Sequence, residues 1–136
     1  MNTNKAFAPH LCIPGGVRDL GFYQNAFGAT ELRRWNNEDG TVHVAEFSIG
    51  DNLFHVHEEK TSAGQFCPDK INGTTVLIGL FVEDVDSVVA KAVEVGAIML
   101  SSPQSYDYGY RQAEVKDPFG HVWLIEMKIG MMRDER

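Results

Sequence analysis

The end of the sequence contains side chains that could bind a metal ion. Residues 114–127 read EVKDPFGHVWLIEM and include His121 and Glu126, separated by a short apolar run. Neutral imidazole and carboxylate groups are ligands that zinc and related divalent ions use in proteins. Such an ion needs several donors that converge on one point, so the elements that carry these residues decide whether a site forms.

The chain contains an internal repeat that places two glutamates at equivalent positions. AEF at 45–47 recurs as AEV at 113–115, and FGA at 27–29 recurs as VGA at 95–97. Both pairs are 68 residues apart, which is half of the 136-residue chain. A shared spacing without gaps indicates two copies of one structural module. The glutamates of the AEF and AEV segments are therefore expected at matching places in the two copies.

The second copy shows the local signals of a βαβββ module. TTVLIGLFV at 74–82 is an apolar run rich in β-branched residues, which is typical of a buried strand. Apolar residues then recur at three- and four-residue spacing over 85–93, which indicates one buried helix face, and Gly96 favours the helix end. DPFG at 117–120 has the residue preferences of a type I turn and predicts a hairpin between the last two strands.

Together the two copies predict an α+β fold in a single domain. The first copy has its strand at 7–13 and its helix at 18–27, and three strands follow the helix in each copy. Those strands are expected at about 30–35, 41–49 and 52–58, and at about 97–101, 110–116 and 121–128. The expected organisation is module one at about 7–58, a polar linker at 59–73 and module two at about 74–129.

Composition narrows the classes of partner. The formal charge of −7 disfavours nucleic acid, whose phosphates attract a basic surface. No apolar run approaches the ~20 residues of a membrane span, and the N-terminus has no apolar signal-peptide core. The two cysteines, Cys12 and Cys67, form neither a zinc pattern nor a disulfide framework. We expect a cytoplasmic protein with no nucleic-acid or membrane partner.

These features resemble the vicinal oxygen chelate superfamily, which includes glyoxalase I, bleomycin-resistance proteins and extradiol dioxygenases. FYQNAFGA at 22–29, DPFGHVW at 117–123 and the paired modules carry the resemblance, which extends over about 7–129. APHLCIPGG at 8–16 and YGYRQAEV at 108–115 look most like its PhnB-like branch. The resemblance implies curved mixed sheets around a pocket for a small molecule, and a homodimer with its pockets within or between chains.

The metal enzymes of that superfamily place ligands on the first and last strands of each module. At the matching positions stand Leu124, seven residues after the aspartate of DPFG, and Leu77, nineteen residues before Gly96. Their repeat mates are Val56 and Pro9. None of these side chains offers a donor to a divalent cation, so we expect no glyoxalase-type metal centre and no cofactor.

An unusual metal site is the alternative, and it would use His10, His57 or Glu126. Side chains of a strand alternate between its two faces, so a histidine one residue from a ligand position points to the other face. By this criterion His10, His55, His57 and His121 are expected to be structural or surface groups. Glu126 lies on the same face as the ligand position of its strand, but nearer the strand end.

The resemblance also implies which side chains face the pocket. The residues three, five and seven positions before Asp117 point inward, and the repeat places Glu46 opposite them. Residues 101–112, SSPQSYDYGYRQ, bring tyrosines near the pocket mouth, either as a mobile lid that stacks on a flat ligand or as a packed hairpin turn. The expected lining is Glu114, Gln112, Tyr110, Tyr108 and Glu126, with Phe54, Val56, Leu77 and Leu124 at the base.

Glu46 and Glu114 support two hypotheses about function. Two carboxylates held close together raise the pKa of one of them, which suits acid–base catalysis, and they could equally hold a cationic ligand. The first hypothesis is a small-molecule binding protein of the glyoxalase/bleomycin-resistance type for a cationic or aromatic metabolite. The second is an enzyme, a lyase or isomerase acting next to a carbonyl, with Glu46 or Glu114 as the base. Both glutamates could also be solvated on an open sheet face.

Overall fold

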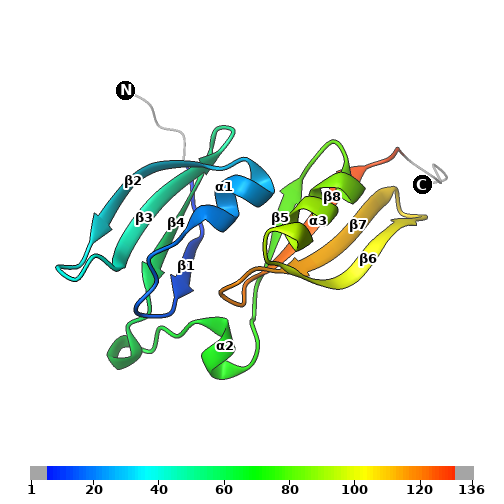
Figure 1. Ribbon diagram of the computed structural model, residues 1–136. Coiled ribbons are helices and arrows are strands. Elements are labelled where there is room, and N and C mark those ends of the chain that lie inside the picture. The colour runs from blue at the N-terminus through cyan, green and yellow to red at the C-terminus, as the bar shows by residue number, and fades with distance from the viewer. Residues whose placement is uncertain (1–5, 131–136) are drawn as a thin grey trace.

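The computed structural model describes residues 6–130 and contains two βαβββ modules, each with a four-stranded mixed sheet (Figure 1). Module one consists of β1 (His10–Ile13), α1 (Gly21–Phe27), β2 (Thr30–Asn36), β3 (Val42–Ile49) and β4 (Asn52–Glu58). Module two consists of β5 (Leu77–Phe81), α3 (Val85–Glu94), β6 (Ile98–Tyr106), β7 (Tyr110–Lys116) and β8 (Val122–Lys128). The segment between them contains η1 (Thr61–Ala63) and α2 (Pro68–Ile71). The predicted α+β class and the paired βαβββ modules are confirmed.

The two sheets share one topology, with strand orders β1-β4-β3-β2 and β5-β8-β7-β6. In each sheet the first strand of the module runs parallel to the last, and the other neighbours are antiparallel. This pattern follows from one helical crossover and two hairpins in each module. It leaves β1 and β5 at the edges of their sheets.

The longer helix, α3, begins and ends where its sequence indicates. A carboxylate oxygen of Asp84 accepts a hydrogen bond from the backbone N–H of Ser87 at 3.1 Å, which caps the helix N-terminus. The buried side chains Val85, Val89 and Ala92 belong to the periodic apolar face. Among residues 6–130, no helix is long and apolar enough to cross a membrane.

The first helix is shorter than the sequence predicts. α1 begins at Gly21, because the preceding residues form an irregular turn in which the Asp19 carboxylate accepts the Gly21 N–H at 2.7 Å. It ends at Gly28, whose φ of 69° lies in the left-handed region that glycine tolerates best. The predicted helix end is therefore confirmed and the predicted start is three residues early.

One hydrophobic core joins the two modules. The ring of Tyr23 in α1 lies 5.3 Å from the ring of Phe54 in module one and 5.8 Å from that of Trp123 in module two, measured between centroids. The Tyr23 hydroxyl and the Trp123 indole N–H both donate to Oδ2 of Asp117, at 2.6 and 3.0 Å. The core therefore encloses a carboxylate from the DPFG turn, and Trp123 is buried beside it.

The position of the helices decides which sheet faces are covered. α1 and α3 contact each other and lie on one side of the two sheets, which stand side by side with β1 and β5 at the centre (Figure 1). One face of each sheet therefore contributes to the shared core. The other face of each sheet, which we call its open face, carries no helix.

Residues 101–112 form a hairpin. β6 continues to Tyr106, and a short turn with Gly109 at a φ of 94° leads directly into β7 at Tyr110. The rings of Tyr106 and Tyr108 stack at a centroid distance of 5.2 Å. The hairpin expected as one interpretation of this segment agrees with the structure.

Candidate functional site

The open face of module one carries two rows of side chains that run across its four strands. The strand register pairs His55 of β4 with His10 of β1 and with Glu46 of β3, and Glu46 in turn with Arg33 of β2. The next row, displaced by two residues along each strand, is Cys12, His57, Val44 and Trp35. All three histidines of β1 and β4 therefore lie on the face that was predicted to hold aliphatic residues.

The predicted orientation of β4 is wrong by one residue. Val56 is 0% exposed and belongs to the core, and it pairs with Leu11 and Ala45. The cause is the β3–β4 hairpin, which is one residue shorter than the β7–β8 hairpin. As a result His55 pairs with Glu46 where Leu124 pairs with Glu114, so the structural repeat spacing in the last strand is 69 residues. Because strand side chains alternate, this single step moves every β4 side chain to the opposite face.

A chain of hydrogen bonds connects the first row. His55 Nε2 lies 2.9 Å from Oε2 of Glu46, and His55 Nδ1 lies 3.1 Å from Nε2 of His10. On its other side Glu46 accepts a bond from Nε of Arg33 at 3.1 Å. The hydrogen bonds from His55 and then Arg33 stabilise the carboxylate and hold the pKa of Glu46 below its ordinary value. Glu46 is therefore an ionised acceptor in a network.

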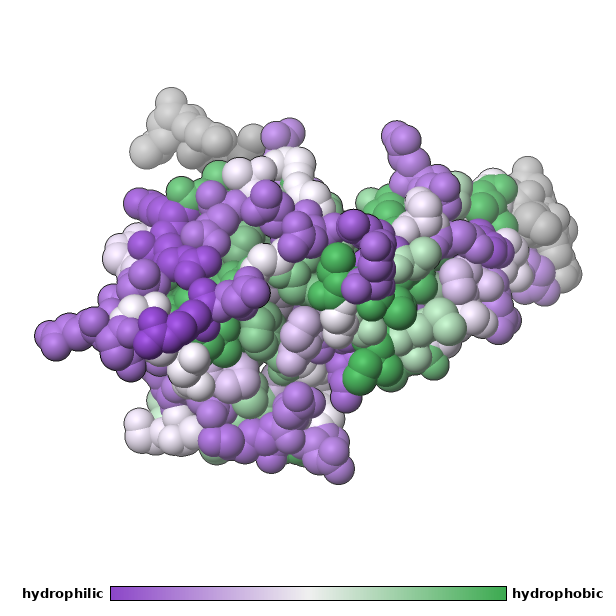
Figure 2. All heavy atoms as spheres, in the orientation of Figure 1, coloured by the Kyte–Doolittle hydropathy of each residue, from purple (hydrophilic) through white to green (hydrophobic). Residues whose placement is uncertain are grey.

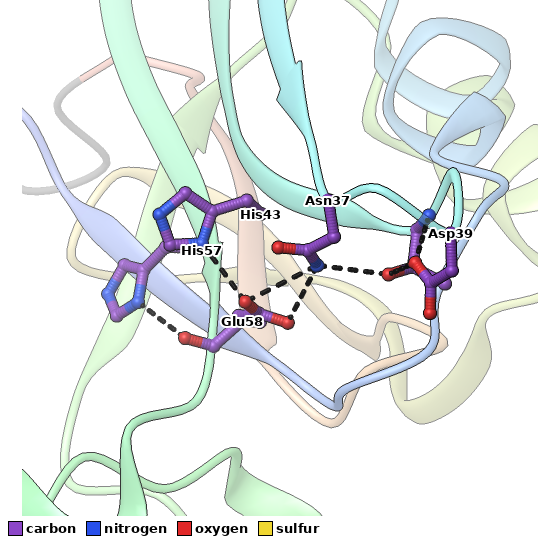
Figure 3. A network of polar contacts seen from close by, with 6 residues as sticks. Asn37, Asp39, His43, His57 and Glu58 are labelled. Carbon is purple, nitrogen blue, oxygen red and sulfur yellow. Dashed lines mark hydrogen bonds and ion pairs between the residues drawn. The ribbon is translucent and has the colours of Figure 1, made fainter.

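A second network fixes His57. Its Nδ1–H donates to the backbone carbonyl of Glu58 at 3.0 Å, which leaves Nε2 as an acceptor, 3.7 Å from Sγ of Cys12. The Glu58 carboxylate is held by His43 Nδ1 at 3.0 Å and by the amide of Asn37 (Figure 3). Burial raises the pKa of the Cys12 thiol, so the thiol remains a proton donor to His57.

The open face of module two carries a different set of groups. Glu126 of β8 is only 7% exposed, and its Oε1 accepts a hydrogen bond from Nε2 of Gln112 at 2.8 Å. The Gln112 carbonyl in turn accepts a bond from the Tyr108 hydroxyl. Glu126 lies directly above Gly79 of β5, where an added Cβ would stand 2.7 Å from Oε2. The missing side chain at Gly79 therefore makes room for the carboxylate.

Aromatic rings lie beside this carboxylate in a row that crosses the strands of the sheet. Tyr108 lies 5.9 Å from Tyr110, and Tyr110 lies 6.1 Å from Phe81 of β5, between ring centroids. Tyr110 is only partly buried, and Tyr108 and Phe81 are exposed, so ring faces are accessible to a ligand. The expectation that Tyr108, Tyr110, Gln112 and Glu126 lie close together therefore agrees with the geometry.

The structure separates the other predicted site residues. Glu114 pairs with Leu124 on module two, while Glu46 is engaged on module one, and the two carboxylates do not interact within residues 6–130. The predicted shared proton between them is therefore wrong for a single chain. Phe54, expected at the pocket base, packs in the core against Tyr23.

Two apolar cavities lie along the seam between the edge strands β1 and β5. The first has a volume of about 590 Å³ and is lined by Cys12, Leu77 and His121 among others, with His10 at its margin. The second has a volume of about 570 Å³, and Phe54 and Phe81 are among its lining residues. Both share Pro9, Leu11 and Ile78. Leu77 thus lines a cavity, as expected, although the cavity lies between modules.

The candidate metal ligands form other contacts. His121 Nε2–H donates to the backbone carbonyl of Cys12 at 2.6 Å and thereby ties the DPFG turn to β1. His10 and His57 stand on module one and Glu126 on module two. In the described part of the chain, no three or more histidine, cysteine, aspartate or glutamate side chains are grouped so that they could hold a metal ion.

Sequence reasoning predicted Glu46 in the first row on module one but missed its neighbours. His10 and His55 were expected on the other face, and no motif indicated Arg33. Polar residues alternate with apolar ones in NLFHVHE of β4, and that alternation alone indicates that His55 and His57 share a face opposite Val56. The period within the strand was a better guide than the spacing between repeats.

Comparisons with known proteins agree with this architecture. The sequence model of the Glyoxalase/Bleomycin resistance protein/Dioxygenase superfamily matches residues 18–125. An uncharacterized protein of Mycobacterium bovis is 32% identical over 135 residues, which cover 95% of this chain and 87% of that protein. The solved structure of a gene product of Arabidopsis thaliana is similar at 27% identity and a TM-score of 0.67, covering 90% of this chain and 98% of the other.

A further solved structure shares the fold at lower identity. TioX from Micromonospora sp. ML1 has a TM-score of 0.68 at 22% identity, and the alignment covers 90% of this chain and 95% of TioX. This likeness shows the fold alone. The family match over 108 residues and the relative at 32% identity show more, and on their strength the chain belongs to the glyoxalase/bleomycin resistance protein/dioxygenase superfamily.

Proposed function

We propose that the protein binds a small, flat molecule with a positive charge on the open face of module two. The observation that carries this proposal is the nearly buried carboxylate of Glu126, held by Gln112 beside the row of aromatic rings. A carboxylate attracts a cation, and aromatic ring faces stack on flat ligands and attract cationic groups. An apolar surface with a few convergent polar groups is the usual form of a small-molecule site.

The site is completed, in this proposal, by a second copy of the chain. The open faces expose large side chains, among them Phe81 at 58% and Trp35 at 46%. In the view of Figure 2, which has α1 and α3 in front of the sheets, hydrophobic residues also reach the surface of module two on the side of its helix. The superfamily resemblance implies a homodimer, and we propose that in it the open face of module two of one copy lies against that of module one of the other. Membership of the PhnB-like branch and location in the cytoplasm stay predictions from the sequence.

Binding of a flat aromatic cation tests the proposal. We expect 9-aminoacridine, followed by its fluorescence, to bind the purified protein more tightly than the aromatic anion 1-anilinonaphthalene-8-sulfonate. Glu126→Gln removes the charge but keeps the shape, and we expect it to weaken acridine binding roughly tenfold, equivalent to about 1.4 kcal/mol. The matched control is Glu94→Gln, since Glu94 stands on α3 with its side chain in solvent.

Two results would contradict this function. One is equal binding of the cation and the anion by the unmodified protein. The other is an unchanged affinity for 9-aminoacridine in Glu126→Gln while Glu94→Gln is also unchanged. Near-ultraviolet circular dichroism of each variant checks that the aromatic environment of the core is retained.

A further inference from the structure

We propose that His10 is the proton acceptor of an acid–base site on the open face of module one, with His55 and Glu46 as the residues that position it. The reaction class is removal of a proton from carbon in a small molecule with an electron-withdrawing group. The site differs from the glutamate base expected from the sequence. It also lies on the other sheet from the binding site proposed above and stands independently of it.

Hydrogen-bond donors and acceptors assign the protons along this row. The ionised Glu46 carboxylate can only accept, so His55 carries its proton on Nε2, the atom 2.9 Å from Oε2. A neutral His55 then has its lone pair on Nδ1, and it accepts from Nε2–H of His10 at 3.1 Å. A neutral His10 is left with its lone pair on Nδ1. That nitrogen is the base.

Glu46 supports the base through His55. When His10 takes up a proton, it becomes an imidazolium, and the relay connects this charge to the Glu46 carboxylate. A carboxylate behind a histidine holds the ring in one tautomer and stabilises the charged form. Glu46 itself is anchored by Arg33, whose guanidinium lies over the ring of Trp35 at 5.1 Å. The carboxylate is thus fixed before a substrate binds.

The position of His10 allows a substrate to reach it. His10 is exposed at the β1 end of the row, and on one side it lines the apolar cavity of about 590 Å³ between β1 and β5. On its other side it borders a shallow hollow of about 490 Å³ over the open face, together with Trp35, Val44 and His57. A flat molecule lying on Trp35 and Val44 would have its edge near the His10 ring.

The charges around His10 favour its neutral form at pH 7. Burial, followed by the neighbouring imidazoles of His55 and His57, holds the pKa of His10 below its ordinary value. A base must be unprotonated to act, and a depressed pKa keeps it so at neutral pH. The titratable or charged groups that border the ring or its cavities are His55, His57, Cys12, Glu46, Arg33, Lys60 and His121.

The elimination of 5-nitrobenzisoxazole tests the base without a cofactor. The base removes the proton from C3, the C–H electrons form the nitrile, and the N–O bond breaks to release a coloured phenolate. The proton passes from His10 to water, so no other reactant is needed. We expect the protein to accelerate this reaction over buffer. The rate should rise with pH as His10 loses its proton and then level off, and the midpoint of this rise should lie below the pKa of free imidazole.

Variants separate the roles of the three residues. We expect His10→Gln to return the rate to that of buffer. Glu46→Gln keeps an acceptor for His55 but removes the charge, so we expect kcat/KM to fall about tenfold and the midpoint of the pH profile to move lower. The control is Glu94→Gln on α3, for which we expect an unchanged rate.

Several outcomes would overturn the proposal. They are a rate no higher than that of buffer, a rate that survives His10→Gln, and a pH midpoint that does not move in Glu46→Gln. Long-range ¹H–¹⁵N NMR correlations give a readout that needs no turnover. We expect the neutral His10 ring to carry its proton on Nε2, and a dominant Nδ1–H tautomer would contradict the relay.

Discussion

At the scale of single residues, the most constrained polar group is the carboxylate of Asp117. It is 3% exposed, and the Tyr23 hydroxyl, the Trp123 indole N–H and the backbone N–H groups of Phe119 and His121 all donate to it. A buried charge is stable only when it is paired or fully hydrogen-bonded, and here four donors take that role. Asp117 connects α1 of module one to β8 of module two, so the same aspartate that begins the turn also joins the modules.

Removal of one donor from Asp117 should lower stability measurably. Tyr23→Phe deletes only the hydroxyl and leaves the carboxylate with three donors. We expect a loss of about 1–3 kcal/mol in the free energy of unfolding, because an acceptor in the core loses a bond that water cannot replace. Urea denaturation followed by tryptophan fluorescence measures it.

The matched control is Tyr106→Phe, which deletes a hydroxyl from the β6–β7 hairpin. A surface change of this kind should stay within about 0.5 kcal/mol of the unmodified protein. Equal unfolding free energies for Tyr23→Phe and the unmodified protein would show that the Asp117 cluster does not stabilise the junction of the modules.

At the scale of elements, the two halves of the site were predictable to different degrees. In module two the DPFG turn predicts the hairpin, and the faces that the superfamily resemblance implied for Leu124, Gln112 and Glu126, counted from that turn, agree with the strand pairing. In module one the corresponding turn is Gly50-Asp51, which has no proline, and four residues separate Ser48 from its partner Leu53 where five separate Lys116 from Val122. Counting residues by the 68-residue repeat therefore assigned the side chains of β4 to the wrong faces of the sheet.

Some contacts depend on tertiary structure and have no local signal. The close approach of Glu126 to Gly79 joins β8 to β5, and the bond from Arg33 to Glu46 joins β2 to β3. Strand order in the sheet brings these residues together, and no sequence motif in either strand predicts which residue of the neighbouring strand is contacted. The alternation of polar and apolar residues predicts a face, but not which side chain of the next strand meets it.

Ion pairs between elements make the fold sensitive to acid. Arg111 of β7 donates two hydrogen bonds to the carboxylate of Asp86 in α3, at 2.7 and 2.8 Å. These bonds hold the pKa of Asp86 below its ordinary value of 3.8. A lowered pKa in the folded state adds stability above the unfolded value, and this stability is lost as the pH falls through the folded value.

We expect Asp86→Asn to lower the melting temperature slightly at pH 6 and to lower it less at pH 3. Thermal melts of both proteins between these values, followed by circular dichroism, measure the difference. Glu83→Gln is the control, because that exposed carboxylate has no partner among residues 6–130 and its change should be small throughout. A difference between Asp86→Asn and the unmodified protein that persists undiminished to pH 3 would contradict a role for the ion pair.

At the scale of the whole molecule, the two proposed functional faces belong to different sheets of one copy. The helices α1 and α3 cover the opposite faces of the sheets, so the His10 row and the Glu126 row both lie on open faces, on either side of the seam between β1 and β5. Association of two chains with one face against the other would bring an acid–base group and an aromatic cation site together twice in each dimer. This arrangement explains why each open face exposes large apolar side chains that a lone monomer would be expected to bury.

Two substitutions test that association and its geometry together. Trp35→Glu alters the open face of module one and Phe81→Glu alters that of module two, at side chains that are exposed within one chain. We expect the unmodified protein to sediment at about twice its 15.2 kDa and each variant to sediment mostly as a monomer, because an unpaired charge would be buried in the contact. A rise in the dimer Kd of roughly a hundredfold corresponds to about 2.7 kcal/mol. Val93→Glu, on the exposed side of α3, should remain a dimer.

Mixing the two variants distinguishes the ways in which two faces could meet. If module one of each copy contacts module two of the other, a mixed dimer of Trp35→Glu and Phe81→Glu concentrates both charges in one contact and leaves the second contact unmodified. We therefore expect the equimolar mixture to recover dimer that neither variant forms alone. If each open face instead contacts the same face of the other copy, each of the two contacts in a mixed dimer contains one introduced charge. In that case no dimer returns on mixing. Failure to recover dimer on mixing, or a monomeric unmodified protein, would exclude the shared site.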